Sequence, residues 1–220
     1  MPAILSIPEA VAQIKDGSTV MIGGFMTCGA PTGLIAELAR RHVRDLTLIT
    51  NDTGVQGDGV GMLISADAVT RVIASHIGTN PETGRRMIDG RIHVELVPQG
   101  TLAERIRCAG AGLGGVLTPT GVGTIVAQGK QELVVDGRTY LLETPLRADV
   151  ALIKAWKGDR KGNLVYRRSA RNFNPLMAMA ADLVIAEVEE IVEVGVLDPD
   201  QVMTPGIFVD VMVRSVSRHD

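Results

Sequence analysis

Residues 16–31 of the chain read DGSTVMIGGFMTCGAP. The apolar segment 19–22 is typical of a buried strand, and it leads directly into the sequence Gly23-Gly24-Phe25. Gly29 and Pro31 then precede a segment with helical periodicity. Because glycine lacks a Cβ atom and tolerates positive φ, the backbone amides of such a loop can approach a ligand closely. This stretch therefore predicts a strand, a ligand-binding loop and a helix, in that order.

Length and composition predict an ordinary globular protein. The chain has 220 residues, and 45% of them are hydrophobic. We therefore expect one domain over residues 1–220 with a large buried core. The formal net charge is −3, which gives no electrostatic basis for binding nucleic acid.

The cysteines and the N-terminus predict a cytoplasmic protein. Cys28 and Cys108 are too few for a disulfide framework and have no metal-ligand spacing, so we expect a reducing compartment and no metal. The N-terminal sequence MPAIL lacks the charged region of a signal peptide. No apolar run approaches the roughly 20 residues that cross a membrane, so we expect no membrane association.

Strand and helix patterns alternate along the first half of the chain. This rhythm predicts an α/β fold with a mainly parallel sheet flanked by helices on both faces. The expected strands are 19–22, 46–49, 69–75 and 92–97, and the expected helices are 6–15, 32–42, 82–88 and 101–108.

The second half of the chain contains two hairpin patterns. Asp136-Gly137 lies between two β-rich runs, and Asp159–Asn163 is a turn between two more. We expect both hairpins to be additions to the one sheet rather than a second domain. A helix at 175–180 and strands at 183–186 and 207–213 complete the predicted elements, and the glycine-rich segment 110–123 is expected to be an ordered loop.

Polar side chains follow four of the predicted strands. Ligands bind open α/β sheets beyond the carboxyl ends of their strands, so these segments are expected to meet in one crevice. They are Gly23-Gly24-Phe25, Asn51-Asp52, Ser75-His76 and Pro98-Gln99-Gly100. Taken alone, each segment is also compatible with an ordinary turn or a helix cap. Together they predict a site that holds an electrophile through amides and carboxamides.

Nucleophiles are harder to find in this sequence. Cys28 has no identifiable base nearby, and thiolate chemistry needs one. Glu82 and Glu104 lie on polar helix faces, where solvated surface is the default. Glu143 ends an apolar strand and is expected to be structural. Neither a carboxylate pair nor a Ser/His/Asp arrangement is apparent.

The sequence of residues 16–31 resembles the signature of the family I coenzyme A transferases, in their α subunit. Further similar segments cover almost the whole chain and are closest to the branch that uses acetate or butyrate with acetoacetate. They are 74–84 (ASHIGTNPETG), 97–102 (VPQGTL), 118–124 (TPTGVGT) and 170–176 (ARNFNPL).

This resemblance implies a particular reaction and a partner. Such enzymes move coenzyme A (CoA), as a substrate, from an acyl-CoA to a free carboxylate through a glutamate nucleophile. The family's glutamate lies in a Glu-Asn-Gly segment of the β subunit, and this chain has no such segment. The resemblance therefore implies a heteromer, of α2β2 type, in which a β subunit supplies the nucleophile.

The resemblance also implies roles for individual residues. Asn51 and Gln99 match positions that face the active-site glutamate and the reacting carbonyl. The loop that contacts CoA or its pantetheine arm is matched by Gly24, Phe25, Met26, Thr27, Cys28, Gly29 and Ala30. At Met26, Thr27 and Cys28 the family pattern is permissive, so backbone contacts are expected there.

Two other functions are compatible with the residues. Sugar-phosphate isomerases resemble CoA transferases in fold, and a glycine loop could hold a phosphate, although no acid/base pair is evident. A non-catalytic acyl-CoA-binding module is the other alternative.

Overall fold

The strand predicted at Thr19–Ile22 is β2 of the structure, a computed structural model that describes residues 1–216. It lies between β3 (Leu46–Asp52) and β9 (Ala148–Asp159), and both run parallel to it. Its last three residues are buried, which is the pattern of a strand that is covered on both faces.

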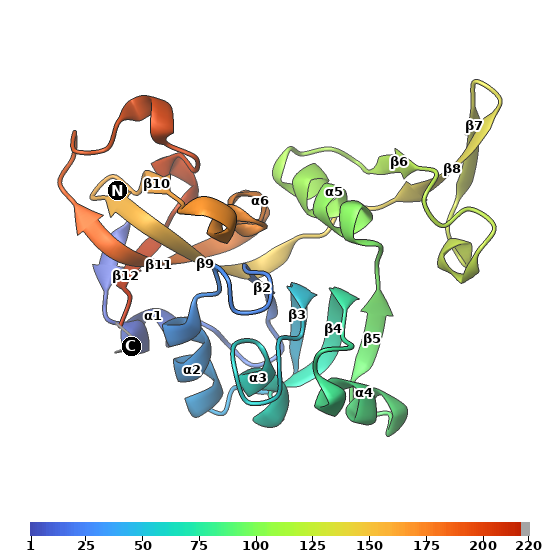
Figure 1. The fold of residues 1–220 in the computed structure, drawn as a ribbon, viewed down its shortest axis with the longest axis horizontal. Helices are drawn as coiled ribbons and strands as arrows, with labels where there is room; N and C mark the ends of the chain where they lie inside the picture. Colours follow the sequence, from blue (N-terminus) through green and yellow to red (C-terminus); the bar gives the residue numbers. More distant parts are fainter. Residues whose placement is uncertain (217–220) are drawn as a thin grey trace.

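The main sheet continues on both sides of these three strands. Its order is β1-β12-β11-β9-β2-β3-β4-β5, and every neighbouring pair on this path is parallel (Figure 1). The short strand β10 pairs antiparallel with β9. The additional strands are β1 (Ala3–Leu5), β4 (Val69–His76), β5 (His93–Leu96), β10 (Leu164–Val165), β11 (Ala181–Val192) and β12 (Val211–Arg214). The predicted mainly parallel sheet is confirmed.

Helices cover both faces of this sheet, as the sequence predicts. Figure 1 shows α1 to α4 on one side and α5 and α6 on the other. The helices are α1 (Ile7–Val11), α2 (Thr32–Arg40), α3 (Gly61–Ser65), α4 (Pro81–Ile88), α5 (Gln99–Gly110) and α6 (Asn174–Ala178), with 3-10 turns η1 (Ile125–Ala127), η2 (Arg168–Arg171), η3 (Pro199–Gln201) and η4 (Gly206–Phe208). Among the described residues, no helix is both long and apolar enough to cross a membrane.

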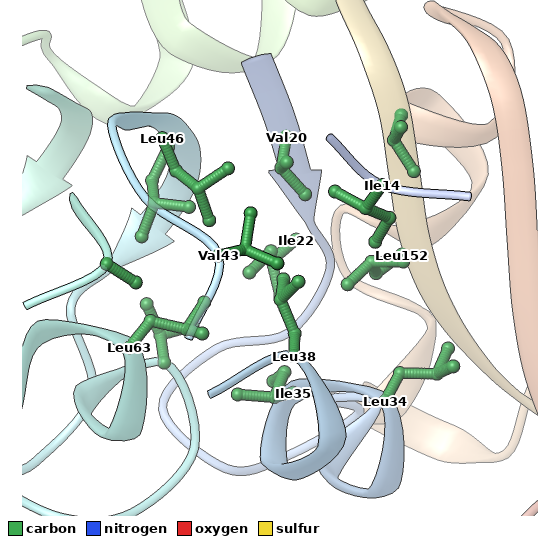
Figure 2. Packing of buried hydrophobic residues seen from close by; sticks show 14 of the residues in the cluster. Ile14, Val20, Ile22, Leu34, Ile35, Leu38, Val43, Leu46, Leu63 and Leu152 are labelled. Carbon is green, nitrogen blue, oxygen red and sulfur yellow. The ribbon is translucent and has the colours of Figure 1, made fainter. Parts of the chain in front are cut away.

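The strand β2 divides its side chains between two hydrophobic cores. Val20 and Ile22 pack with the core beneath α2, where Leu38 is fully buried (Figure 2). Met21 points to the opposite core, which includes Ile106 of α5. Successive side chains of a strand point to opposite faces, so one apolar strand can serve both layers. Each such buried side chain contributes about 1.5–3 kcal/mol of transfer free energy.

A buried carboxylate fixes the start of α2. Glu187 on β11 is fully buried and accepts hydrogen bonds from the Leu34 N–H at 3.0 Å, Lys154 Nζ at 3.0 Å and Ser215 Oγ at 2.7 Å. The helix has no side-chain cap of its own at Pro31. Glu187 therefore satisfies one of the free N–H groups of its first turn from another element. This contact fixes the point at which the loop after β2 ends.

One prediction about the hairpins is wrong. The turn at Asp136-Gly137 forms with positive φ at both residues, but its strands β7 (Glu132–Val135) and β8 (Arg138–Glu143) do not join the main sheet. They form a separate antiparallel sheet with β6 (Val116–Thr118), within the segment expected to be a loop. The free edge of β8 pairs with β6, so the hairpin does not pair with a strand of the main sheet. Figure 1 shows this small sheet projecting away from the rest of the chain.

The other predicted elements differ mainly at their ends. The second hairpin is confirmed, since β9 and β10 pair around the turn at 159–163. The first helix ends at Val11 instead of Lys15, and the last strand begins at Val211 because residues 206–208 form η4. The helix α3 was not expected, because glycines surround it.

Candidate functional site

The loop after β2 is closed by its own backbone. Phe25 and Cys28 exchange both N–H···O bonds at 3.0 Å, and Met26 between them has a φ of +54°. A two-residue turn of this kind requires positive φ, and Met26 adopts it although it is not glycine. The loop is therefore a small hairpin, with Phe25 half exposed beside its tip.

Most N–H groups of residues 24–30 are already engaged. Five of the seven donate within the protein: Gly24 to Asn172 Oδ1, Phe25 to the Cys28 carbonyl, Met26 to Asp52 Oδ2, Cys28 to the Phe25 carbonyl and Ala30 to the Thr27 carbonyl. Within the described part of the chain, the N–H groups of Thr27 and Gly29 are the two that lack such a partner. Within this structure, the Thr27 and Gly29 N–H groups are therefore the backbone amides of the loop that remain available for the expected ligand contacts.

The glycines of this loop are explained by packing against the segment 170–174. A Cβ on Gly23 would lie 1.9 Å from Asn174 Oδ1, and one on Gly29 would lie 2.4 Å from the Ala170 carbonyl oxygen. Gly24 has a φ of +122°, a conformation that side chains disfavour. The glycines thus permit close approach of another part of the chain, and not only of a ligand.

Two asparagines of that segment hold the loop. Asn172 Oδ1 accepts from the Gly24 N–H at 3.1 Å, and its Nδ2 donates to the Cys28 carbonyl at 3.0 Å. The fully buried Asn174 donates from Nδ2 to the Gly29 carbonyl at 3.0 Å and accepts the Lys154 N–H, also at 3.0 Å. Asn174 therefore ties the loop to β9, and both carboxamides tie it to η2, because Asn172 also donates to the Ser169 carbonyl and Asn174 to the Ala170 carbonyl. The sequence signal for them is the resemblance at 170–176, to which no role was assigned.

Asp52, at the end of β3, connects this loop to the next one. Its Oδ2 accepts from the Met26 N–H at 2.8 Å and from Asn51 Nδ2 at 2.9 Å, and its Oδ1 accepts from the Gly54 N–H at 2.7 Å. The carboxyl group is almost fully buried. Hydrogen bonds to an ionised acceptor are about twice as strong as neutral ones, so three of them can compensate for its burial. The sequence predicts Asp52 either as part of the site or as a turn or cap residue, and in the structure it holds two loops together.

The loop after β3 has a related form and lies against the first. Val55 and Asp58 are paired by an isolated bridge, and Gly54 has positive φ. A Cβ on Gly59 would lie 3.8 Å from Thr27 Cγ2, so the two loops are in contact range. Thr79 holds this second loop by donating from Oγ1 to the Gly54 carbonyl at 2.8 Å.

The four polar segments predicted at the strand ends meet at one pocket. We call it the strand-end pocket, and its volume is about 450 Å³. Its lining residues are Phe25, Met26, Asn51, Asp52, Ser75, His76, Thr79 and Gln99. Parallel strands end at the same edge of a sheet, which is why segments far apart in sequence converge here.

The two predicted carboxamides occupy different environments in this pocket. Asn51 is buried, and its orientation is fixed because Oδ1 accepts from Ser75 Oγ at 3.2 Å while Nδ2 donates to Asp52. Only one of its two amide hydrogens is used by Asp52, so the second can donate to a ligand. Gln99 is exposed and begins α5, whose first turn carries a partial positive charge. Both can donate to an oxygen on which negative charge develops.

The structure does not bring all predicted loop residues to this pocket. Thr27, Gly29 and Ala30 line a second pocket of about 280 Å³ that also contains Trp156, which we call the Trp156 pocket. Cys28 is exposed and lies near Ser169, with Sγ and Oγ 3.5 Å apart. The loop therefore separates two pockets and contributes side chains to both.

The three glutamates considered as nucleophiles lie elsewhere. Glu82 accepts from Ser65 at 2.6 Å, and this hydrogen bond, together with Arg86, lowers the pKa of Glu82 despite partial burial. Glu104 is exposed and pairs with Arg107, while the buried Glu143 pairs with Lys130 Nζ at 2.5 Å. Among residues 1–216, Asp52 is the one carboxylate that lines the strand-end pocket, and three donors occupy it. The same residues contain no group of three or more His, Cys, Asp or Glu arranged to hold a metal ion.

Sequence comparisons give a consistent result. A sequence profile described as "Coenzyme A transferase" matches residues 4–215. The chain is 58% identical to the acetate CoA-transferase subunit alpha of Escherichia coli K12, over 96% of each chain. It is 50% identical to the acetoacetyl-CoA:acetate/butyrate CoA transferase alpha subunit of Clostridium acetobutylicum, over 91% of this chain and 92% of that one.

A solved structure shows the same fold. It is an acyl-CoA transferase from E. coli O157:H7 in a thioester complex with CoA, with a TM-score of 0.87 and 24% identity. The match covers 97% of this chain and 47% of that one, so this chain spans about half the length of the solved protein.

The account of Asp52 predicts the effect of an isosteric change. In Asp52→Asn, one carboxylate oxygen becomes an NH₂ group, which faces a donor in either amide orientation. At least one buried N–H then loses its acceptor, so we expect a loss of about 1–3 kcal/mol in the free energy of unfolding. Denaturant-induced unfolding measures it, and amide hydrogen exchange should show reduced protection at Met26 or at Gly54, whichever amide faces the new NH₂ group. The exposed Asp89→Asn is the control, and unchanged exchange at both amides in Asp52→Asn would contradict this role.

Proposed function

The chain belongs to the coenzyme A transferase family, and from this we propose that it is the α subunit of an enzyme that transfers CoA between an acyl-CoA and a short-chain carboxylate. Acetyl-CoA, butyryl-CoA or acetoacetyl-CoA is the donor, and acetate, butyrate or acetoacetate is the acceptor. The names of the relatives from E. coli and C. acetobutylicum support this choice of substrates.

The observation that carries the proposal is a strand-end pocket rich in oxygen-binding groups that offers, among the residues the structure describes, no free carboxylate as a nucleophile. The only lining carboxylate in the described chain, Asp52, is fully used in holding the loops. A reaction through a covalent glutamyl intermediate therefore needs a glutamate from outside this chain. We assign that residue to a β subunit that closes over the strand-end pocket.

The chemistry divides between the two subunits. The β-subunit carboxylate attacks the thioester carbonyl and the C–S bond breaks. The CoA thiolate departs, and an acyl-glutamyl anhydride remains on the β subunit. The thiolate then attacks the glutamyl carbonyl and releases the donor's carboxylate, which gives a glutamyl-CoA thioester. The acceptor carboxylate completes the transfer by the same two steps in reverse. The thioester's free energy is conserved because water takes no part.

In this scheme the present chain supplies orientation and electrostatic stabilisation. Asn51 and Gln99 donate to the oxygen that becomes negative when the carbonyl is attacked. The loop Gly24–Ala30 lies along the pantetheine arm: Phe25 and Met26 face the strand-end pocket, while Thr27 and Gly29 offer the unengaged N–H groups.

We assign the assembly and its location on the same basis. Residues 1–220 form one domain, and two copies join two β subunits in a cytoplasmic α2β2 heterotetramer. The relatives' names as alpha subunits support a heteromer. The strand-end pocket is open on the isolated chain, which is consistent with a partner that covers it.

Because the nucleophile is assigned to the β subunit, we expect CoA transfer to require that subunit. The purified chain alone should show no CoA transfer from acetoacetyl-CoA to acetate, and co-expression with the β subunit should restore it. A thioester-absorbance assay on both preparations measures the difference. Turnover by the isolated chain would disprove the requirement for a second subunit.

Gln99→Ala tests the oxygen-binding role. Loss of a donor to the developing negative charge typically costs about 2–4 kcal/mol, so we expect kcat of the assembled enzyme to fall by roughly 30- to 1000-fold. Gln13→Ala, an exposed change at the end of α1, is the matched control. If kcat stays at the parent value while the variant assembles normally, Gln99 has no role in the reaction.

A further inference from the structure

Three exposed arginines flank the loop after β2. Arg167 precedes η2, and Arg168 and Arg171 lie in it. The same segment is pressed against the loop, because Asn172 and Asn174 bind its carbonyls and Ala170 contacts Gly29. The carboxamides of Asn172 and Asn174 therefore fix the position of this segment relative to the loop.

These arginines differ from the neighbouring cations in β9 and the residue after it. Lys154, Lys157 and Arg160 all pair with glutamates of the adjacent strand β11 or the residue after it. No carboxylate within residues 1–216 forms an ion pair with Arg167, Arg168 or Arg171. Three cations without an acid partner thus lie within five residues of one another, which makes this segment a candidate for binding an anion.

The Trp156 pocket connects the arginines to the candidate site. Arg167, Trp156 and Lys154 line it together with Thr27 and Gly29 of the loop. The Arg167 guanidinium lies 5.7 Å from the centre of the Trp156 ring, within the range of a cation–π contact. That contact stabilises the long side chain while its remaining N–H groups stay available.

One acidic residue also lines this pocket. Glu189 is half exposed and lies 3.9 Å from Lys154 Nζ. Because the buried Glu187 already pairs with Lys154, the positive charge that faces a ligand on this side of the loop comes from Arg167 together with Arg168 and Arg171. Among the described residues, no Lys or Arg lines the strand-end pocket on the other side. The loop thus separates the strand-end pocket from the side of the chain on which these arginines lie.

We propose that Arg167, Arg168 and Arg171 bind the phosphate groups at the nucleotide end of CoA, with the Trp156 pocket as its entrance. This inference rests on the proposed function, since an acyl-CoA has its reactive thioester at one end and its phosphates at the other. With the thioester in the strand-end pocket, the pantetheine arm passes along the loop and the phosphates reach the arginines. Guanidinium groups suit this ligand because they bind phosphate oxygens in a bidentate manner.

A pair of substrates that differ only in the nucleotide tests the proposal. Arg167→Ala, Arg168→Ala and Arg171→Ala are assayed in the α–β complex with acetoacetyl-CoA and with acetoacetyl-pantetheine. A lost charged hydrogen bond typically gives at least a tenfold effect, so each variant should raise KM for acetoacetyl-CoA by about tenfold. KM for acetoacetyl-pantetheine and kcat for both substrates should be unchanged. The Arg44→Ala variant, which changes an exposed arginine between α2 and β3, is the control.

Inhibition by adenosine 3′,5′-bisphosphate gives an independent measurement. Its inhibition constant should rise about tenfold in the same variants, and the difference should shrink at high salt because screening weakens exposed charge interactions. Equal increases of KM for both substrates, or unchanged KM for acetoacetyl-CoA, would overturn the arginine site. Variants that lose affinity for the β subunit but keep KM once assembled would assign the arginines to the subunit interface instead. A parent complex without any CoA transfer would overturn the proposed function itself.

Discussion

The carboxylate of Asp52 is the interaction on which the candidate site depends. It lies at the end of β3, where it accepts the Met26 N–H from one loop, the Gly54 N–H from the next and the side-chain amide of Asn51. Burying an ionised group is costly unless donors surround it, and here three do. A single side chain thus sets the relative position of two loops and the orientation of the Asn51 side-chain amide. Because this carboxylate holds the two loops, the proposed function assigns the nucleophile to another residue.

The surrounding contacts extend the same principle. Asn172 and Asn174 fix the far side of the first loop, and Glu187 fixes the start of the helix that follows it. Each uses a polar side chain, fully buried in Asn174 and Glu187, to satisfy backbone groups that would otherwise lack partners. The result is a loop whose amides are largely occupied and whose shape is set before any ligand binds. Under the proposed function, such preorganisation favours precise placement of the thioester in the strand-end pocket.

Local sequence predicted the elements, and tertiary contacts decided their details. The bounds of β2 were predicted correctly because four residues of strand character lie between a turn and two glycines. The convergence of Asn51 and Gln99 followed from the rule that parallel strands end at one edge.

The sequence could not show that β3 extends through Asp52, because its polar end is stabilised by partners distant in the chain. Likewise, β6 was missed because its partner β8 lies more than 20 residues away. The sequence predicts ligand contacts for the glycines of this loop. In the structure, Gly23 and Gly29 instead allow the segment 170–174 to approach closely.

The central claim is that this chain positions a thioester which a second chain attacks. The most direct test is to incubate the assembled α–β complex with acetoacetyl-CoA, without an acceptor, and to determine the intact mass of each denatured subunit. The account predicts that the mass of CoA, joined through a thioester, appears on the β subunit alone and disappears on treatment with hydroxylamine. A covalent CoA or acyl adduct on the chain described here would contradict it.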